Sequence, residues 1–406
     1  MTNHFIDRSQ FPALMQEIDG RPLNYLDSAA TTLKPRVMID AVTEYYSQNG
    51  ANIHRGKHRL SDEASNAYEA ARLAVADYVS AQANEVVFTH NTTHALNIVA
   101  QGLALRKSDL VIAGVDSHHS QLLPWRQVAT LRFIQTDDQG RIDLDHFQTL
   151  LAQRPKVVAL THCSNVTGVV HPIEQMIAMI RTQSDAVIVL DAAQSLPHGR
   201  LNLHTLGADF VAFSAHKMLG PTGLGFLYAN QHRLDALKPL QFGGGTVDWV
   251  DADGQVNRRA PYHLEAGTPA IASVIGAGAT FRLLAGFEET ARREHDKGLV
   301  NALLSGAASR PYLKLIGPAD GENRHAIGAF KFSDCVSVGE IARLLSDAYG
   351  IMCRSGYLCA QPFVSTLAGG EILRASAYLY NTTADIDALY QALDDLAECM
   401  GLPTVN

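Results

Sequence analysis

Two segments of the chain decide the fold: Ala186-Val-Ile-Val-Leu-Asp191-Ala-Ala-Gln194 and Asp209-Phe-Val-Ala-Phe-Ser214-Ala-His216-Lys217. Each begins as a continuous apolar run and ends in polar residues. Continuous rather than alternating apolarity is typical of strands buried on both faces of a mainly parallel sheet. The chain between Asp191 and Lys217 is long enough for a crossover connection, so the two strands can lie parallel in one sheet.

The same pattern extends outward toward the N-terminus. Short apolar runs predict strands at Glu85–Thr89, Asp109–Ala113 and Lys156–Thr161. The segment Ser61–Ala81 predicts a helix, because acidic residues occupy its first turn and apolar residues recur on one side. Strands that alternate with helices predict an α/β fold over residues 21–287.

A different rhythm begins near residue 288 and predicts a smaller α+β unit. Its expected elements are a helix to Ala308, a strand at Ala326–Phe332, a helix at Val338–Tyr349, strands at Gly350–Arg354 and Glu371–Tyr378, and a final helix opened by Thr382 and Thr383. We therefore predict an N-terminal arm at residues 1–20 that packs with the small domain. The large domain is expected at 21–287 and the small C-terminal domain at 288–406.

Composition and charge exclude several classes of function. The 406 residues carry 33 Lys and Arg against 41 Asp and Glu, a net charge of −8. Phosphate-rich partners need clustered positive charge, so no nucleic acid and no membrane are expected as partners. The first twenty residues lack the apolar run of a signal peptide, and the most apolar stretch, Ile271–Phe287, is interrupted by Arg282. Five scattered cysteines without a CxxC pair indicate a reduced, cytoplasmic protein with no metal site.

One edge of the predicted sheet carries side chains suited to pyridoxal 5'-phosphate (PLP). Ligands of open α/β sheets bind at the carboxyl ends of the strands, where Asp191 and Lys217 fall. A lysine can bond to the aldehyde of this cofactor, and a buried carboxylate keeps its pyridine nitrogen protonated. The segment Phe88–His94 adds a strand-to-helix junction whose hydroxyls and N–H groups suit a phosphate. Asp191 alone would be an ordinary strand-end residue and Lys217 alone a solvated one, so the combination carries the interpretation.

These motifs resemble those of cysteine desulfurases of the SufS/CsdA type (group II), which have the class V aminotransferase fold. The matching stretches follow one another over nearly the whole chain: Tyr25–Ala30, His54–Gly56, Asn91–Thr93, His118–His119, Ser164–Val166, Asp191–Gln194, Ser214–Lys217, Glu265–Pro269, Arg354–Ala360 and Leu373–Ser376. The resemblance implies a PLP-dependent transferase of fold type I. Its large domain would hold a mainly parallel seven-stranded sheet.

The resemblance also implies residue roles. Contacts to the cofactor ring are implied for Lys217, which bonds to it, Asp191 at the pyridine nitrogen, Gln194 at the phenolic oxygen and His118 stacked on its face. Contacts to the phosphate are implied for Thr92, Thr93, Ser214, His216 and, from a second subunit, Thr268. Residues near the substrate would be Arg374, which grips its carboxylate, and Asn165, Arg354, His54 and Arg55. The contribution of Thr268 implies a homodimer.

The thiol of Cys359 narrows the chemistry, because many PLP enzymes share the same cofactor pocket. Cys359 lies in a loop of polar and turn residues between two predicted strands, close in sequence to Arg374. A thiolate there could take sulfur from bound cysteine as a persulfide, and a nearby Arg354 would favour that thiolate. The remaining cysteines are interpreted as ordinary packing residues: Cys163, Cys335, Cys353 and Cys399. A redox role for Cys353 stays open.

The expected activity is a cysteine desulfurase that converts L-cysteine to L-alanine. Lys217 or His118 would remove the Cα proton, and Cys359 would then attack the substrate sulfur. In this family a short cysteine loop accompanies dependence on a separate acceptor, so a SufE/CsdE-like protein is the expected partner. Iron–sulfur cluster assembly or another sulfur-compound pathway would consume the sulfur.

Other functions on the same fold stay open. A selenocysteine lyase or another C–S lyase need not use Cys359, and a transaminase or epimerase needs no thiol. A catalytically silent binding protein in a sulfur-transfer complex would not bind PLP. Some positions depart from the family pattern, namely Asn91, His94, Ser117 and Ala215. His94 and Ser117 put substrate preference in doubt rather than cofactor use.

Overall fold

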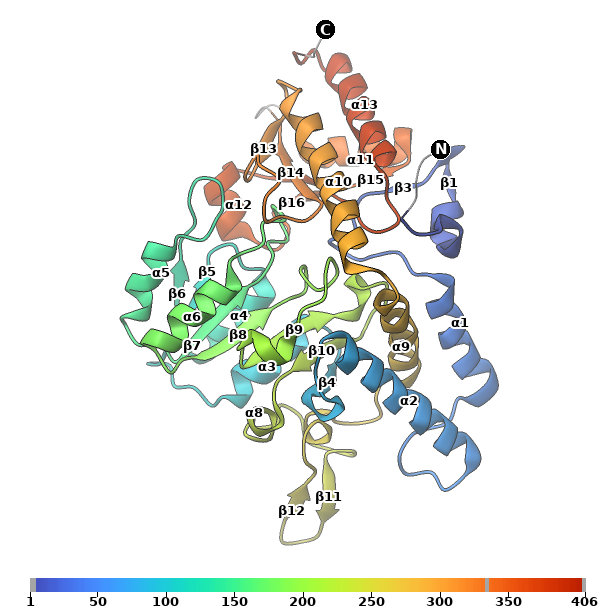
Figure 1. Cartoon of the computed structure of the whole chain (residues 1–406), viewed down its shortest axis with the longest axis vertical. Helices are drawn as coiled ribbons and strands as arrows, with labels where there is room; N and C mark the ends of the chain where they lie inside the picture. Colours follow the sequence, from blue (N-terminus) through green and yellow to red (C-terminus); the bar gives the residue numbers. More distant parts are fainter. Residues whose placement is uncertain (1–4, 333–335, 404–406) are drawn as a thin grey trace.

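A computed structural model describes residues 5–332 and 336–403 and contains a seven-stranded sheet (Figure 1). The strands lie in the order β4 (Val86–Thr89), β10 (Gly225–Tyr228), β9 (Phe210–Ser214), β8 (Val187–Asp191), β7 (Val157–Thr161), β5 (Leu110–Gly114) and β6 (Thr130–Ile134). Only β10 runs antiparallel to its neighbours; the other pairings are parallel. The α/β fold with a mainly parallel seven-stranded sheet is confirmed.

Both faces of this sheet are buried, as the continuous apolar runs predict. In β7, Val158 and Leu160 belong to one hydrophobic core, whereas Val157 and Ala159 belong to another. Successive side chains of a strand point to opposite faces, so each core covers one face. The covering helices are α2 (Arg59–Tyr78), α3 (Thr92–Gly102), α4 (His119–Val128), α5 (Leu144–Leu151), α6 (Ile173–Gln183) and α9 (Ile271–Ala285), with short α7 (Leu203–Leu206) and α8 (Gln231–Asp235) in connections.

Two strands of this sheet were not predicted from the sequence. β6 lies at the sheet edge and has alternating exposed and partly buried residues, so it lacks a continuous apolar run. β10 has only four residues and follows a glycine-rich stretch that reads as a turn. Because β10 pairs with both β4 and β9, it closes the gap between the two parts of the predicted phosphate site.

Helix α9 is apolar on nearly all sides, and it is accordingly buried against α2 and against α1 (Arg36–Glu44). Within residues 5–332 and 336–403, no single helix is long and apolar enough to cross a bilayer. Only α9 together with α10 (Glu289–Ala308) meets that criterion by length and composition, with a bend of 91° between them.

The C-terminal part of the chain forms a second, antiparallel sheet, which lies above the first in Figure 1. Its strands lie in the order β13 (Lys314–Ile316), β14 (Ile327–Lys331), β17 (Ile372–Ser376) and β16 (Arg354–Gly356). Helices α10, α11 (Val338–Tyr349), α12 (Gln361–Ala368) and α13 (Thr383–Cys399) accompany it. The sequence predicted these elements except β13, β16 and α12. The residues of β16 and the first residues of α12, Gln361 and Pro362, were predicted as loop.

The predicted strand Gly350–Arg354 is wrong as a single element. Its first half is β15 (Ile351–Met352), which pairs in parallel with β3 (Asn24–Tyr25), and its second half begins β16. The N-terminal segment that contains β3 therefore pairs with the C-terminal part of the chain. Arg8 also forms an ion pair of 2.8 Å with Asp385 of α13.

A hairpin of β11 (Val247–Val250) and β12 (Gln255–Asn257) projects from the large sheet at the bottom of Figure 1. Trp249 is 64% exposed and Phe242, which precedes the hairpin, is 67% exposed. Val250 and Val256 of the hairpin are also exposed. Four large apolar side chains are therefore exposed on and beside this projection.

Candidate active site

A cavity of about 250 Å³ lies at the carboxyl ends of β4, β5, β7, β8 and β9, which all reach the same edge of the sheet. The predicted site residues that line it are Lys217, Asp191, Gln194, His118, Thr92, Thr93, Ser214, His216, Asn165, Arg354, Arg374 and Cys359. Lys217 and Cys359 therefore line one cavity, although Lys217 follows a strand of the large sheet and Cys359 follows a strand of the C-terminal sheet.

Lys217 and Asp191 form the electrostatic centre of the cavity. Burial lowers the pKa of Lys217 to about 8, although the nearby Asp191 carboxylate opposes that shift. Burial raises the pKa of Asp191, whereas the Ala193 N–H bond of 2.9 Å and Lys217 act in the opposite direction. No hydrogen bond or ion pair of Lys217 Nζ occurs in the described residues. An uncommitted amine of low pKa is suited to bonding with an aldehyde.

His118 and Gln194 complete the walls beside Lys217. Burial and the adjacent Lys217 charge lower the pKa of His118 to about 3, so its imidazole is neutral at physiological pH. His118 Nδ1 accepts a hydrogen bond from the Ser120 backbone N–H at 3.1 Å, which fixes the ring at the start of α4. Gln194 donates from Nε2 to the Ala29 carbonyl at 2.7 Å.

Hydroxyl groups gather at the start of α3, where a phosphate is expected. The Ser214 hydroxyl lies 2.6 Å from the Thr92 hydroxyl and accepts from the Thr92 backbone N–H at 2.9 Å. The Thr93 hydroxyl lies 2.7 Å from that of Ser120. Asn91 caps the helix by accepting from the His94 N–H. Clustered hydroxyls at a helix N-terminus suit an anion.

Gly225 allows β10 to approach this helix start. A Cβ atom on Gly225 would lie 2.5 Å from Asn91 Cα, which no ordinary side chain can tolerate. The backbone of β10 therefore lies close to the start of α3 at this position. Together, the uncommitted Lys217 amine, the buried Asp191 carboxylate and the hydroxyls at α3 fit the aldehyde, ring nitrogen and phosphate of PLP.

Arg374 joins the two sides of the cavity. It is almost fully buried in β17 and donates from Nη1 to the Asn165 carbonyl and from Nη2 to the Asp27 carboxylate, each at 2.9 Å. Burial lowers its pKa, while Asp27 opposes that change. A guanidinium has five N–H donors, so donors remain for a substrate carboxylate. Arg354 is exposed and pairs with the other Asp27 oxygen at 3.2 Å.

The loop that carries Cys359 has an unusual backbone. Leu358 and Cys359 have φ values of 53° and 56°, in the left-handed region that non-glycine residues rarely adopt. Two hydrogen bonds hold this conformation: Asn165 Nδ2 donates to the Leu358 carbonyl at 2.9 Å, and the His119 N–H donates to the Cys359 carbonyl at 2.8 Å. The Cys359 side chain is exposed at the rim of the cavity.

The other described cysteines differ from one another. Cys353 is half-buried, and burial raises its pKa, which agrees with ordinary packing. Cys399 is exposed, so its interpretation as a buried packing residue is wrong; it lies on the outer side of α13. Cys163 is buried and lines the cavity, which the sequence did not predict; burial raises its pKa too. Cys335 lies outside the described residues.

Arg354, His54 and Arg55 have surroundings that differ from the expectation. Arg354 lines the cavity but pairs with Asp27, and no hydrogen bond between Arg354 and the Cys359 thiol occurs in the described residues. His54 packs edge-on against Tyr68 and Tyr262, away from the lining of this cavity. Arg55 is exposed and does not line it either. Thr268 is exposed and lies outside this chain's own cavity. Its implied contact is with the phosphate of a second subunit, so that role stays a prediction.

Two positions that depart from the family pattern lie behind the cavity wall. Ser117 is fully buried and accepts a hydrogen bond of 2.9 Å from the Thr161 hydroxyl. His94 stacks on His90 with ring centroids 4.7 Å apart. Neither residue lines the cavity, so both act on it only through their neighbours.

Ser120 lines the cavity but was not predicted as a site residue. A lone serine at the start of a helix gives no functional signal in the sequence.

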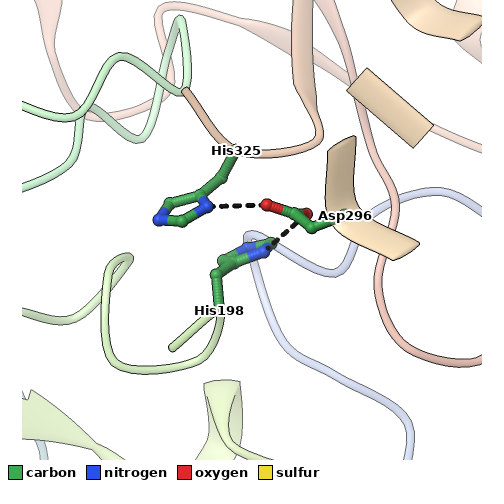
Figure 2. Close-up of side chains that lie close together, drawn as sticks. All are labelled: His198, Asp296 and His325. Carbon is green, nitrogen blue, oxygen red and sulfur yellow. Dashed lines mark hydrogen bonds and ion pairs between the residues drawn. The ribbon is translucent and has the colours of Figure 1, made fainter. Parts of the chain in front are cut away.

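A second cavity of about 850 Å³ has His198, Asp296 and His325 in its wall (Figure 2). His198 Nδ1 lies 3.0 Å from one Asp296 oxygen and His325 Nδ1 lies 2.7 Å from the other. The two rings are stacked, with centroids 4.3 Å apart and planes 14° apart, so one ion cannot lie in the plane of both rings. Although burial opposes it, the two histidines hold the pKa of Asp296 well below its usual range. The cluster is a hydrogen-bond network between α10 and the loops that carry the histidines.

Comparisons with known proteins agree with this geometry. Residues 24–389 match the family model described as aminotransferase class-V. Proteins named "probable cysteine desulfurase" from Synechocystis and Halalkalibacterium halodurans are 39% and 38% identical, over 95% and 96% of this chain and 94% and 97% of their own. Among solved structures, the apo cysteine desulfurase of Thermococcus onnurineus NA1 aligns with a TM-score of 0.89 at 34% identity, covering 97% of each chain. The Escherichia coli cysteine desulfurase CsdA aligns with a TM-score of 0.87 at 35% identity, over 97% of this chain and 98% of its own.

Proposed function

The chain belongs to the class V aminotransferases and, within them, to the cysteine desulfurases, and from that premise we propose how its residues act. It is a PLP-dependent enzyme that takes sulfur from L-cysteine and leaves L-alanine. The observation that carries the assignment of residues is the convergence of the Lys217 amine and the Cys359 thiol on one cavity of about 250 Å³. A transaminase or epimerase would need no thiol there.

The residues around the cavity divide the cofactor between them. Lys217 would hold PLP covalently, and Asp191 would support the protonated pyridine nitrogen. Thr92, Ser214 and the start of α3 would receive the phosphate. His118 lines the same cavity with a neutral imidazole. When bound, PLP withdraws electrons from the substrate Cα and so weakens its bond to hydrogen.

The chain's own groups then move one proton and one sulfur atom. Lys217, or His118 in its neutral form, accepts the proton from the substrate Cα. Arg374 holds the substrate carboxylate. The Cys359 thiolate attacks the substrate sulfur, so an S–S bond forms as the Cβ–S bond breaks, and the electron pair of that bond stays on the three-carbon fragment. That fragment takes up protons and leaves as alanine, while Cys359 carries a persulfide.

The proposed activity is tested by mixing the purified protein, PLP and L-cysteine and measuring alanine and sulfide. The expected result is equal release of alanine and reducible sulfur, with Cys359→Ala losing cysteine turnover. L-Selenocysteine, assayed in both proteins, separates the alternative of a selenocysteine lyase, which would keep its turnover in Cys359→Ala. A keto acid, an inverted amino acid or no PLP binding would contradict the desulfurase.

A sulfur acceptor is required to regenerate the Cys359 thiol, and a SufE/CsdE-like protein is the proposed one. Cys359 is exposed at the cavity rim on a short loop, where a second protein's thiol can meet it. Iron–sulfur cluster assembly or another sulfur-compound pathway is the proposed destination. The described cysteines form no disulfide with one another, which supports a reducing, cytoplasmic location.

We also propose that the enzyme is a homodimer. The exposed apolar side chains around the β11–β12 hairpin support a dimer, since a second subunit would bury them. Thr268 is exposed and lies outside this chain's own cavity. The N–H of the adjacent Gly267 donates to the Gly244 carbonyl at 2.7 Å, which places Thr268 near the start of this hairpin. Sedimentation should show a dimer for the wild type and a monomer for Trp249→Glu. A monomeric wild type would contradict the proposal.

A further inference from the structure

The segment Thr31–Lys34 lies against the peptide bond that joins His216 to Lys217. The His216 carbonyl oxygen accepts hydrogen bonds from the Thr32 N–H at 2.9 Å and from Lys34 Nζ at 2.9 Å. The Thr31 and Thr32 hydroxyls lie 3.1 Å and 3.0 Å from the same oxygen. A carbonyl oxygen has two lone pairs, and the two shortest contacts, from the Thr32 N–H and the Lys34 amine, can occupy both of them. This carbonyl is held more firmly than an ordinary loop carbonyl.

Lys34 has no counter-ion. No carboxylate forms an ion pair with it among residues 5–332 and 336–403, and its other neighbour is the Thr31 hydroxyl at 3.4 Å. Burial lowers the pKa of Lys34 to about 7, with no charged group acting against that shift. Holding a half-buried amine on one carbonyl costs desolvation energy. Fixing the position of the His216 carbonyl offsets this desolvation cost.

The same segment also holds the far side of Lys217. The Thr32 hydroxyl accepts from the Leu219 N–H at 2.9 Å, and Leu219 has a left-handed φ of 61°. Lys217 is therefore bracketed by two anchored peptide groups, one before it and one after it. Upstream of Thr31, Ala29 and Ala30 line the cavity itself.

We propose that Lys34 is a positioning residue that fixes the turn carrying Lys217 and so aims its amine into the cavity. Lys34 acts through the His216 carbonyl and does not line the cavity. The inference rests on the proposed role of Lys217 and adds a residue outside the cavity to it. Removing the donor from Lys34 should let the turn move and misplace the Lys217 amine.

The test compares Lys34→Met, Lys34→Arg and the control Lys156→Met, which removes an exposed lysine. Each apo-protein is mixed with PLP, and uptake is followed by the visible absorbance of the covalently held cofactor. In Lys34→Met, both the rate of uptake and kcat should fall about 10-fold, because small misplacements of reacting groups have effects of this order or larger. The KM for cysteine should stay within about twofold, since the substrate contacts are intact.

The conservative variant and the control decide between positioning and mere stability. Lys34→Arg should keep most of the wild-type rate of PLP uptake, and Lys156→Met should match the wild type. A Lys34→Met protein with a lower Tm but wild-type uptake, absorbance and kcat would overturn the proposal while leaving the role of Lys217 intact. If Lys34→Met is insoluble, Lys34→Gln takes its place in the same comparison. A wild type that takes up no PLP would overturn the proposed function as well.

Discussion

The two ends of the cavity are held in opposite ways. At one end, Asp191 and Lys217 follow central strands of the large sheet, and Lys217 is anchored on both sides through backbone hydrogen bonds. At the other end, Cys359 lies on an exposed loop of the C-terminal sheet whose conformation depends on Asn165 and His119. The comparison indicates that cofactor chemistry needs a fixed amine, whereas sulfur transfer needs a thiol that a second protein can reach.

The cysteine loop has more backbone strain than the turn that follows Lys217. A left-handed non-glycine residue costs on the order of 1 kcal/mol; Leu358 and Cys359 are two consecutive residues of this kind, whereas the turn after Lys217 has one, Leu219. The backbone oxygens of Leu358 and Cys359 accept hydrogen bonds from the large-sheet side of the cavity. Breaking those bonds frees the loop to relax, so we expect the loss of one of them to displace the Cys359 thiol.

The largest expected effect is at the lysine end. Lys217→Ala should remove the visible absorbance of covalently held PLP and reduce alanine formation by about 1000-fold or more, because both the covalent anchor and a proton acceptor are lost. Absorbance spectra and an alanine assay measure the two effects. The exposed Lys156→Ala is the matched control. An unchanged spectrum would show that another lysine holds the cofactor.

Cys359→Ala should separate the two ends. Alanine formation from cysteine should fall by about 100-fold or more, because the sulfur acceptor is missing. The PLP absorbance should remain, since the Lys217 end is unchanged. Cys399→Ala, which removes another exposed thiol, should keep full turnover. Equal turnover in Cys359→Ala and wild type would remove this thiol from the reaction.

Asn165→Ala tests whether the loop is held from across the cavity. Loss of the bond to the Leu358 carbonyl should lower kcat about 10-fold through misplacement of the thiol. Asn301→Ala, which removes an exposed asparagine of α10, is the matched control and should keep full turnover. Steady-state kinetics with cysteine measure both. Wild-type kcat in Asn165→Ala would show that the position of the thiol does not depend on this bond.

The smallest expected effect is a pH dependence of PLP uptake at the lysine end. The Lys217 amine attacks an aldehyde only when neutral, and burial lowers its pKa to about 8, so PLP uptake by the apo-protein should rise up to that pH and then level off. Asp191→Asn removes a negative charge that favours the ammonium form, so the midpoint should move to lower pH. Uptake rates measured between pH 6 and about 9 give the midpoint. A midpoint near that of a free lysine would contradict burial of the amine.

The sequence predicted the lysine end better than the cysteine end, for physical reasons. Long apolar strands have a local signal, and the carboxyl-edge rule then places Asp191 and Lys217 together. The loop's left-handed residues have no such signal, because Leu358 and Cys359 are ordinary residue types for which that conformation is unfavourable. Helix α12 was missed because Pro362 reads as a turn, although proline is tolerated in the first turn of a helix.

Contacts between distant segments could not be predicted from local pattern. Lys34 lies 182 residues from His216 in sequence, and Ser120 meets Thr93 only because α3 and α4 begin at the same sheet edge. The alternating strand β6 was hidden by its place at the edge of the sheet. His54 and Arg55 were predicted near the site, but they lie outside this chain's own cavity.

The most direct test of the account is to find where the sulfur goes. The PLP-loaded enzyme is treated with L-cysteine, digested without reductant and analysed by mass spectrometry. We expect one added sulfur atom on the peptide that contains Cys359, and no addition in Lys217→Ala. Sulfur on the cavity-wall Cys163 instead, or full turnover with an unmodified Cys359 peptide, would contradict the claim that an amine and a thiol from two different sheets act on one substrate.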